Sequence, residues 1–99
     1  MSIVKTKTLL IAAQKRQIGI PAFNTSNLEI MQAVVQAAEE MKAPIIIEIS
    51  QGIIRYAGFE NISTLAMTMI RNSSAPIALH LDHATDLKQI KKALEVGYS

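Results

Sequence analysis

The sequence predicts an α/β fold built on a parallel sheet, and two patterns indicate this class. Apolar runs that suit strands alternate with segments whose apolar residues recur at helical spacing. The expected strands start about 25 to 32 residues apart, which is the length of one parallel βαβ unit. The 99 residues are 49% hydrophobic and 18% charged, which suits one small globular domain and excludes a disordered or fibrous chain.

The first half of the chain predicts a helix, a strand and a second helix. Residues 6–16 suit a short helix with Thr6 or Thr8 as its N-cap and a basic last turn. Residues 17–24 suit a short strand that Pro21 interrupts. Residues 26–42 carry a capping box, Ser26 with Glu29, and are expected to form the best-defined helix. Its apolar residues at helical spacing are Ile30, Val34, Ala37, Ala38 and Met41.

The second half continues the alternation. Residues 43–50 contain an isoleucine run, typical of a strand buried on both faces, and residues 51–60 suit a glycine-containing loop. A helix is expected over 62–70 and a third strand over 75–83. The last helix, over 85–97, should have Leu87, Ile90 and Leu94 on one face and three lysines opposite, and should stop at Gly97. Residues 97–99 lie where a fourth strand would begin.

This order matches the first three βα units of a TIM (β/α)8 barrel, preceded by a helix. A complete barrel needs about 250 residues, so we expect residues 1–99 to form the N-terminal fragment of a single barrel domain. The outer strands of such a fragment would have unpaired edges. The isolated chain should therefore be unstable or should associate.

Composition argues against several classes of protein. The net charge of +2 comes from scattered lysines and arginines, so we expect no nucleic-acid partner. The apolar run near the N-terminus is too short for a signal peptide or a membrane span, so we expect a soluble, cytoplasmic protein that does not bind membranes. The chain has no cysteine, which excludes disulfide and thiolate chemistry. It also has neither G-x-G-x-x-G nor a P-loop motif.

Each expected strand is apolar in its body and turns polar at its C-terminal end. The polar residues are Asn24, Ser50 and the pair Asp82 and His83. In (β/α)8 barrels this end of the sheet carries the active site. Asn24 and Ser50 could equally begin turns or cap helices. Their repetition in three successive units favours a functional site.

Asp82 and His83 are the residues best suited to chemistry. An imidazole can bind a metal ion, and an adjacent carboxylate can transfer protons. Neighbours in a straight strand face opposite ways, so both serve one site only if the chain bends there. His80 has the parity of Asp82, but a histidine in an apolar run is more often a hydrogen-bonded core residue. Arg55 could approach a phosphate or could simply be a solvated surface side chain.

Three stretches resemble the N-terminal part of the class II, metal-dependent aldolases, which include fructose-bisphosphate and tagatose-bisphosphate aldolases. They are "PAFNTSNLEIMQAVVQAAEEMKAPIIIEIS", "GIIRYAG" and "PIALHLDHATDLKQIKKALEVGYS". The resemblance implies a (β/α)8 barrel, a catalytic zinc ion and reversible cleavage of a ketose 1,6-bisphosphate. The products implied are dihydroxyacetone phosphate and glyceraldehyde 3-phosphate.

Residue by residue, the resemblance makes His83 a zinc ligand and Asp82 the catalytic acid/base. Asn24 and Ser50 match positions near the substrate and its phosphate, and His80 matches a histidine that is not a ligand. The other zinc ligands, the phosphate loop and a further catalytic carboxylate belong to later strands of the family. A phosphorylated sugar substrate is therefore expected for the full-length protein, which should be a homo-oligomer. The 99-residue chain alone should be inactive.

Two other functions remain open from the sequence. The chain could be a non-catalytic barrel fragment or association module whose strand edges pair with another chain. It could also belong to a metal-free barrel isomerase acting on a phosphorylated sugar. The sequence does not distinguish fructose from tagatose bisphosphate as the substrate.

Overall fold

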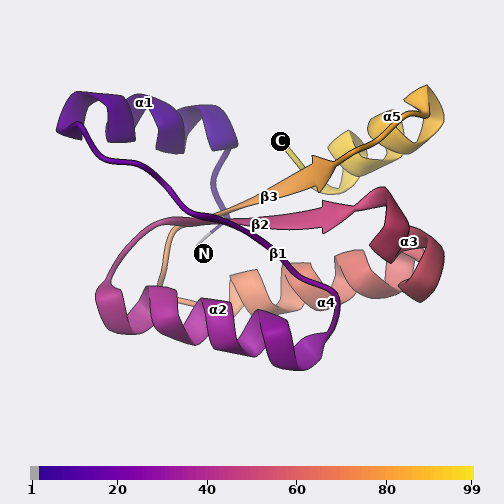
Figure 1. Ribbon diagram of the computed structural model, residues 1–99, viewed down its shortest axis with the longest axis horizontal. Helices are drawn as coiled ribbons and strands as arrows, with labels where there is room; N and C mark the ends of the chain where they lie inside the picture. Colours follow the sequence, from indigo (N-terminus) through magenta and orange to yellow (C-terminus); the bar gives the residue numbers. More distant parts are fainter. Residues whose placement is uncertain (1–2) are drawn as a thin grey trace.

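A computed structural model describes residues 3–99, which form a three-stranded parallel sheet with helices on both faces (Figure 1). The elements in chain order are α1 (Thr6–Arg16), β1 (Ala22–Asn24), α2 (Leu28–Met41), β2 (Ile45–Ser50), α3 (Gln51–Ala57), α4 (Phe59–Arg71), β3 (Ile77–Asp82) and α5 (Leu87–Val96). The strands lie in the order β1-β2-β3, and both pairings are parallel. This confirms the predicted class and order of strands.

The register of the strands divides their side chains into two sets. Ile46 pairs with Ala22 on one side and Ala78 on the other, while Ile47 pairs with Phe23 and Leu79. Because paired residues share a face and successive residues alternate, even-numbered strand residues face one side of the sheet and odd-numbered ones the other.

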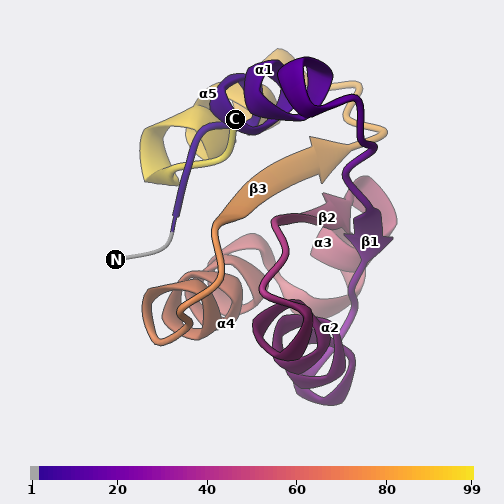
Figure 2. The same cartoon turned by 90° about the vertical axis from the view of Figure 1, so that its left-hand side faces the viewer.

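The odd-numbered face carries the main hydrophobic core. It packs against α2 and α4, which lie on the same side of the sheet (Figure 2). Fully buried core side chains from the strands are Ile47, Ile49, Ile77 and Leu79, and they meet Met31 of α2 and Ile70 of α4. The isoleucine run is thus buried as predicted, because one face meets these helices.

The even-numbered face is covered only in part, by α1. Leu9 of α1 packs against Ile46 and Ala78 in a second, smaller cluster, together with Val4 and Ile20. This cluster lies at the N-terminal ends of the strands. Beyond it, toward the C-terminal ends, the same face turns polar.

The outer edge of β3 contacts both ends of the described chain. Ile3 forms an isolated parallel bridge with Ile77, and the Ser99 amide donates to the Leu79 carbonyl at 2.8 Å. Ser99 also bonds Thr6 at the start of α1: the Thr6 amide donates to Ser99 Oγ at 2.9 Å, and Thr6 Oγ1 donates to the Ser99 carbonyl at 3.0 Å. Residue 99 therefore occupies the first pairing position beside β3, where a fourth strand was expected.

Two predicted helix starts were wrong. The N-cap of α1 is Lys5, which makes no side-chain cap bond, so neither Thr6 nor Thr8 caps it. The N-cap of α2 is Asn27, whose Oδ1 accepts from the Ile30 amide at 2.9 Å. The Ser26–Glu29 capping box therefore does not form, because the extended Asn27 takes the cap position.

The buried face of α2 also differs from the prediction. Met31, Val35 and Ala38 are buried, whereas Ile30 and Met41 are exposed. Helical spacing alone fitted two adjacent stripes of this apolar helix, and packing against the sheet selects the stripe that contains Met31.

Two segments fold differently from their predicted state. The expected strand over 17–24 is regular only at 22–24. The expected loop over 51–60 contains α3, because Ser50 caps it and the left-handed Gly58 (φ 89°) separates it from α4. Seven residues are too few to show helical periodicity in the sequence.

The predicted helix α5 forms, but most of its apolar face is exposed. Leu87 is 72% exposed and Leu94 61% exposed, whereas Ile90 is partly buried. Among residues 3–99, only the segment at Ile3 and Val4 and the segment at Ser99 lie along the outer edge of β3, so no further strand of the described chain lies beneath α5. Gly97 does end the helix as expected, with φ 117°.

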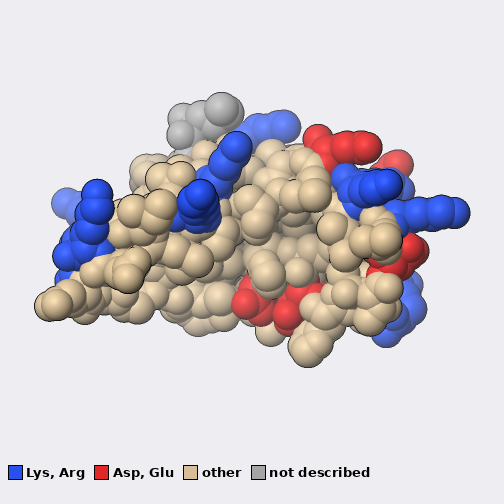
Figure 3. Space-filling view, turned by 90° about the horizontal axis from the view of Figure 1, so that it is seen from above, with Lys and Arg blue, Asp and Glu red and all other residues tan. Residues whose placement is uncertain are grey.

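Charged side chains are spread over the surface. Seen from above, lysine and arginine side chains gather over α1 and over α5, where carboxylates lie among them (Figure 3). Within the described residues no helix is both long and apolar enough to cross a membrane.

Candidate active site

The polar residues predicted from the strand ends meet on one face and one edge of the sheet. Asn24, Ser50 and Asp82 are the last residues of β1, β2 and β3. All are even-numbered, and Ser50 pairs directly with Asp82 across the sheet. They therefore project from the face that α1 covers only at its opposite end. Asn24 lies one step lower in this register, because it pairs with Glu48.

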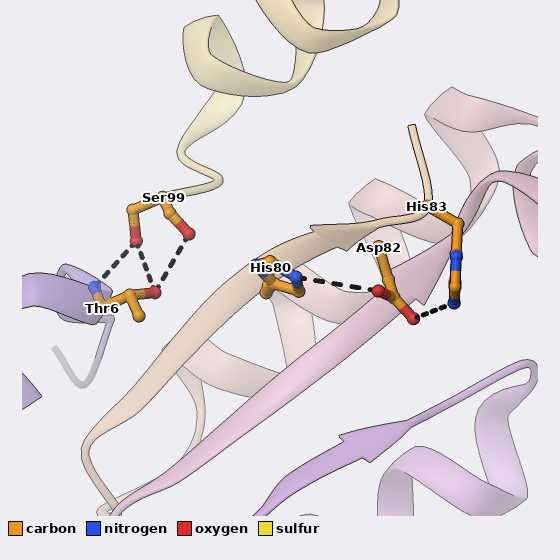
Figure 4. Close-up of polar contacts among 5 residues, drawn as sticks. All are labelled: Thr6, His80, Asp82, His83 and Ser99. Atoms are coloured by element: carbon orange, nitrogen blue, oxygen red, sulfur yellow. Dashed lines mark hydrogen bonds and ion pairs between the residues drawn. The ribbon is translucent and has the colours of Figure 1, made fainter. Parts of the chain in front are cut away.

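Asp82 lies between two histidines (Figure 4). Its Oδ1 is 4.0 Å from His80 Nε2, and its Oδ2 is 3.5 Å from His83 Nε2. The Asp82 side chain is 23% exposed, compared with 40% for His80 and 83% for His83. The carboxylate is thus partly withdrawn from water and has an imidazole on each side.

The backbone bends directly after β3, at His83, as a site shared by Asp82 and His83 requires. His83 directly follows β3 and has a left-handed backbone, with φ 57°. In a continuing strand its side chain would face the opposite side from Asp82. The left-handed turn instead brings its imidazole to the Asp82 carboxylate. A non-glycine residue held in this region costs roughly 1 kcal/mol or more, which the surrounding contacts must offset.

His80 faces the site and not the hydrophobic core. It pairs with Glu48 in the register, so it lies on the even-numbered face one step below Asp82. The interpretation of His80 as a core histidine is therefore wrong in its placement, although its contact with Asp82 agrees with a supporting role.

Ser50 has a structural role in addition to its place at the site. Its Oγ accepts from the Ile53 amide at 3.2 Å and so caps α3. Ser50 Oγ and an Arg55 Nη atom lie 3.7 and 3.8 Å from the point that a Cβ on Gly52 would occupy. The hydroxyl and the guanidinium thus share one side of Gly52, where the missing side chain leaves both accessible.

Sequence reasoning missed Glu48. This residue lies between Asn24 and His80 in the register, on the same face. It was read only as part of a buried apolar strand. Its even position, shared with Ser50 two residues later, was the signal that could have identified it.

A cavity of about 430 Å³ opens beside the C-terminal half of β3. Its lining includes His80 and His83 on the side of the site, and Ile90, Leu94 and Tyr98 on the side of α5. Both histidines are therefore accessible from the outer edge of β3.

The donor set fits one metal ligand and no more. His83 offers an imidazole nitrogen and is highly exposed, and it lies close to a carboxylate, as a metal-binding histidine commonly does. Within residues 3–99, however, no group of three or more His, Cys, Asp or Glu side chains is arranged to hold a metal ion. Catalytic zinc usually has three protein ligands, so His83 can supply only part of such a site.

Comparisons with known proteins identify the family to which this fold belongs. The sequence profile of the family described as "Fructose-bisphosphate aldolase class-II" matches residues 4–99. The chain belongs to the class II fructose-bisphosphate aldolase family. This confirms the resemblance seen in the sequence.

Three similar proteins illustrate the match. A sulfofructosephosphate aldolase of Alkalicoccus urumqiensis is 38% identical over 98 residues, 99% of this chain and 34% of that protein. A fructose-bisphosphate aldolase of Thermus caldophilus is 36% identical over 91 residues, 92% of this chain and 30% of that protein. The crystal structure of the YdjI aldolase of Escherichia coli K12 superimposes with a TM-score of 0.90 at 28% identity, over 97% of this chain and 38% of that one.

The chain therefore spans about a third of the length of the curated relatives it matches. The superposition confirms the α/β architecture, with the three parallel strands forming part of a larger aldolase fold.

Proposed function

We propose that this chain is the N-terminal part of a single (β/α)8 barrel domain that cleaves a ketose 1,6-bisphosphate reversibly. The observation that carries the proposal is the position of Asp82, partly buried at the end of β3 with His83 turned back onto it. Membership of the class II aldolase family supports the reaction class. The expected products are dihydroxyacetone phosphate and glyceraldehyde 3-phosphate.

In this proposal Asp82 is the acid/base. Its carboxylate takes the proton from the hydroxyl next to the bond that breaks, and returns it to the aldehyde oxygen during condensation. His80 lies 4.0 Å from the other carboxylate oxygen and keeps Asp82 oriented toward the site. The partial burial of Asp82 limits competition from water for this proton.

His83 would supply one of the ligands of a zinc ion, with the others coming from outside these 99 residues. When bound, such an ion is a Lewis acid that polarises the ketone and stabilises the negative charge that cleavage generates. The ring of His83 is exposed enough to bind a metal through Nδ1 while Nε2 remains directed at Asp82.

Asn24 and Ser50 would bind the substrate. The Ser50 hydroxyl accepts from the Ile53 amide, which leaves its proton free to be donated to an anionic oxygen. The Arg55 guanidinium on the same side of Gly52 adds a cation suited to a phosphate group. Asn24 can both donate and accept at the far side of the same face.

The test is a retro-aldol assay on the intact protein that carries this chain. Fructose 1,6-bisphosphate and tagatose 1,6-bisphosphate are assayed separately, before and after treatment with a chelator. The proposal expects cleavage of at least one, loss of activity with the chelator and recovery on adding zinc. Isomerisation of a phosphorylated sugar that is insensitive to the chelator would support a metal-free isomerase instead.

A second experiment tests the fragment itself. The isolated 99 residues should show no turnover with added zinc, because the described residues provide one metal ligand. Turnover comparable to that of a complete aldolase would contradict the proposal. Joining the chain to the remaining two thirds of the Thermus caldophilus relative should restore cleavage, whereas a non-catalytic association module would not. The size of the intact protein in solution would test the expected homo-oligomer.

A further inference from the structure

Glu48 is an acidic residue on the even-numbered face, beside the candidate site, and the proposed chemistry does not use it. It is an even-numbered residue of β2, paired with Asn24 of β1 and His80 of β3. Strands rise about 3.3 Å per residue, so Glu48 lies roughly 7 Å below Ser50 on the same face. It therefore lies at the lower end of the site, between Asn24 and His80 on the same face.

The carboxylate of Glu48 has no partner in the described structure. Within residues 3–99 it makes no hydrogen bond or ion pair, although the residue is only partly exposed. Its backbone is fixed, since the Glu48 carbonyl accepts from the Thr25 amide at 3.0 Å and lies 3.5 Å from Thr25 Oγ1. The neighbouring His80 directs Nε2 to Asp82. A structural role in pairing with His80 therefore does not account for Glu48.

The chemistry of a carboxylate limits what it can bind. An ionised carboxylate only accepts hydrogen bonds, so its ligand must have an O–H or N–H donor or be a cation. No described cluster of acidic and histidine side chains surrounds it to hold a metal ion. The Glu48 carboxylate would repel a phosphate group, which is better placed beside Ser50 and Arg55, nearer the C-terminal ends of the strands. A ketose bisphosphate has no N–H group, so its hydroxyl groups are the donors that remain for Glu48.

We propose that Glu48 is a specificity-determining residue that accepts a hydrogen bond from a hydroxyl group in the aldehyde half of the substrate. This rests on the proposed aldolase function. Asp82 on β3 serves the hydroxyl at the bond that breaks, and the carbon chain then extends across β2. Its phosphate meets Ser50 and Arg55, and its remaining hydroxyl meets Glu48 below them.

The test measures condensation by the intact protein with dihydroxyacetone phosphate and two aldehydes. One is glyceraldehyde 3-phosphate, and the other is its analogue without the 2-hydroxyl group, 3-oxopropyl phosphate. Glu48→Ala should lower kcat/KM roughly tenfold or more for the hydroxylated aldehyde, because a lost acceptor for a substrate hydroxyl costs that much or more. For the analogue the change should stay within about twofold. Glu48→Gln, which keeps an acceptor oxygen, should lose less than Glu48→Ala.

The controls separate the outcomes. Glu95→Ala removes an exposed carboxylate from α5 and should leave both rates unchanged. Equal losses with both aldehydes would show that Glu48 acts on the site as a whole and would overturn the inference, as would no loss with either. If the unmodified protein forms no carbon–carbon bond with either aldehyde, the proposed function itself fails, which is a distinguishable result.

Discussion

The two faces of the sheet are built from alternate residues of the same strands, yet they serve different purposes. On the odd-numbered face, isoleucines and leucines are closed off by α2 and α4. On the even-numbered face, α1 covers only the cluster of Leu9, Ile46 and Ala78, and the rest is polar. The first face carries the main core and the second carries the candidate site, so a shift of the strand register by one residue would exchange the two sets of side chains.

This division gives the chain a rigid support for its site. In the chain, Leu81 precedes Asp82 and Ile49 precedes Ser50. Ile49 is buried in the main core on the opposite face, and Leu81 packs against that core. The backbones of Asp82 and Ser50 are therefore held by core packing and by the parallel hydrogen bonds of the sheet. Substitutions on the two faces should separate activity from stability.

The largest expected effect is on activity, at the polar face. In the intact protein, Asp82→Asn should lower kcat about 10²- to 10⁴-fold, the usual contribution of a positioned acid/base. The free energy of unfolding should change little, because the amide has almost the same shape. Steady-state kinetics and urea denaturation on the same preparation measure both quantities. A kcat within a few-fold of the unmodified protein would remove Asp82 from its proposed role.

The next effect is on stability, at the apolar face, and two adjacent isoleucines provide a matched pair. Ile47→Ala should cost about 2 to 5 kcal/mol of unfolding free energy, because Ile47 is fully buried in the main core. Ile46→Ala, on the other face and in the smaller cluster, should cost less. Urea denaturation of the two variants of the intact protein measures the difference, and equal costs would contradict the division between faces.

A smaller effect, dependent on pH, is expected at Tyr98. Its hydroxyl bonds Ser63 Oγ at 2.7 Å, and its ring stacks on Phe59. Burial raises the pKa of Tyr98, and the bond to Ser63 opposes this in part. As the pH rises, Tyr98 therefore loses its hydroxyl proton in the unfolded chain before it does so in the folded chain. The stability that the buried tyrosine contributes is complete below about pH 10 and declines as the pH rises further.

Tyr98→Phe should remove that alkaline decline and should cost about 1 to 3 kcal/mol at neutral pH, since it leaves the buried Ser63 hydroxyl without its partner. Thermal unfolding of both proteins between neutral pH and alkaline pH compares them. An identical alkaline decline in the variant would show that another group is responsible.

The smallest effect tests the corrected start of α2. Asn27→Ala should cost about 1 kcal/mol of unfolding free energy, because it removes the acceptor for the Ile30 amide. Ser26→Ala should be nearly neutral, since Ser26 does not cap the helix. Urea denaturation measures both. The reverse order would restore the capping box that the sequence suggested.

Much of the fold could be predicted from the sequence because strand spacing and apolar runs are strong local signals. The isoleucine run of β2 and the polar residues that end all three strands were found in this way. The predictions that failed concerned features that depend on neighbouring residues or neighbouring elements. Ser26 and Asn27 are both residue types that cap helices well, and only the backbone conformation of the folded chain makes Asn27 the N-cap. The apolar face of Leu87, Ile90 and Leu94 was apparent from their spacing, but its exposure depends on which strands lie beneath α5, and residues 3–99 contain no strand beyond β3.

The site was predicted in part for a similar reason. Asp82 and His83 carry chemistry that stands out in an apolar run, and the family resemblance supplied their proposed roles. The left-handed turn that joins them could not be predicted from the sequence, because only a small share of non-glycine residues adopt it, although histidine does so more often than most. Glu48 was missed because the isoleucine run around it was interpreted as buried on both faces, and the even position that it shares with Ser50 was not used. Its register with Asn24 and His80 places it on the polar face. The roles of Asn24, Ser50, Asp82 and His83 remain predictions.

The most direct test of the central claim is the zinc content of the intact protein and of two histidine variants. If the polar end of β3 contributes His83 as a ligand and His80 as support, His83→Ala should lose bound zinc, whereas His80→Ala should retain it. Elemental analysis of the purified proteins, with zinc expressed per polypeptide, gives the answer. Zinc retained by His83→Ala, or lost only from His80→Ala, would contradict this account of the site.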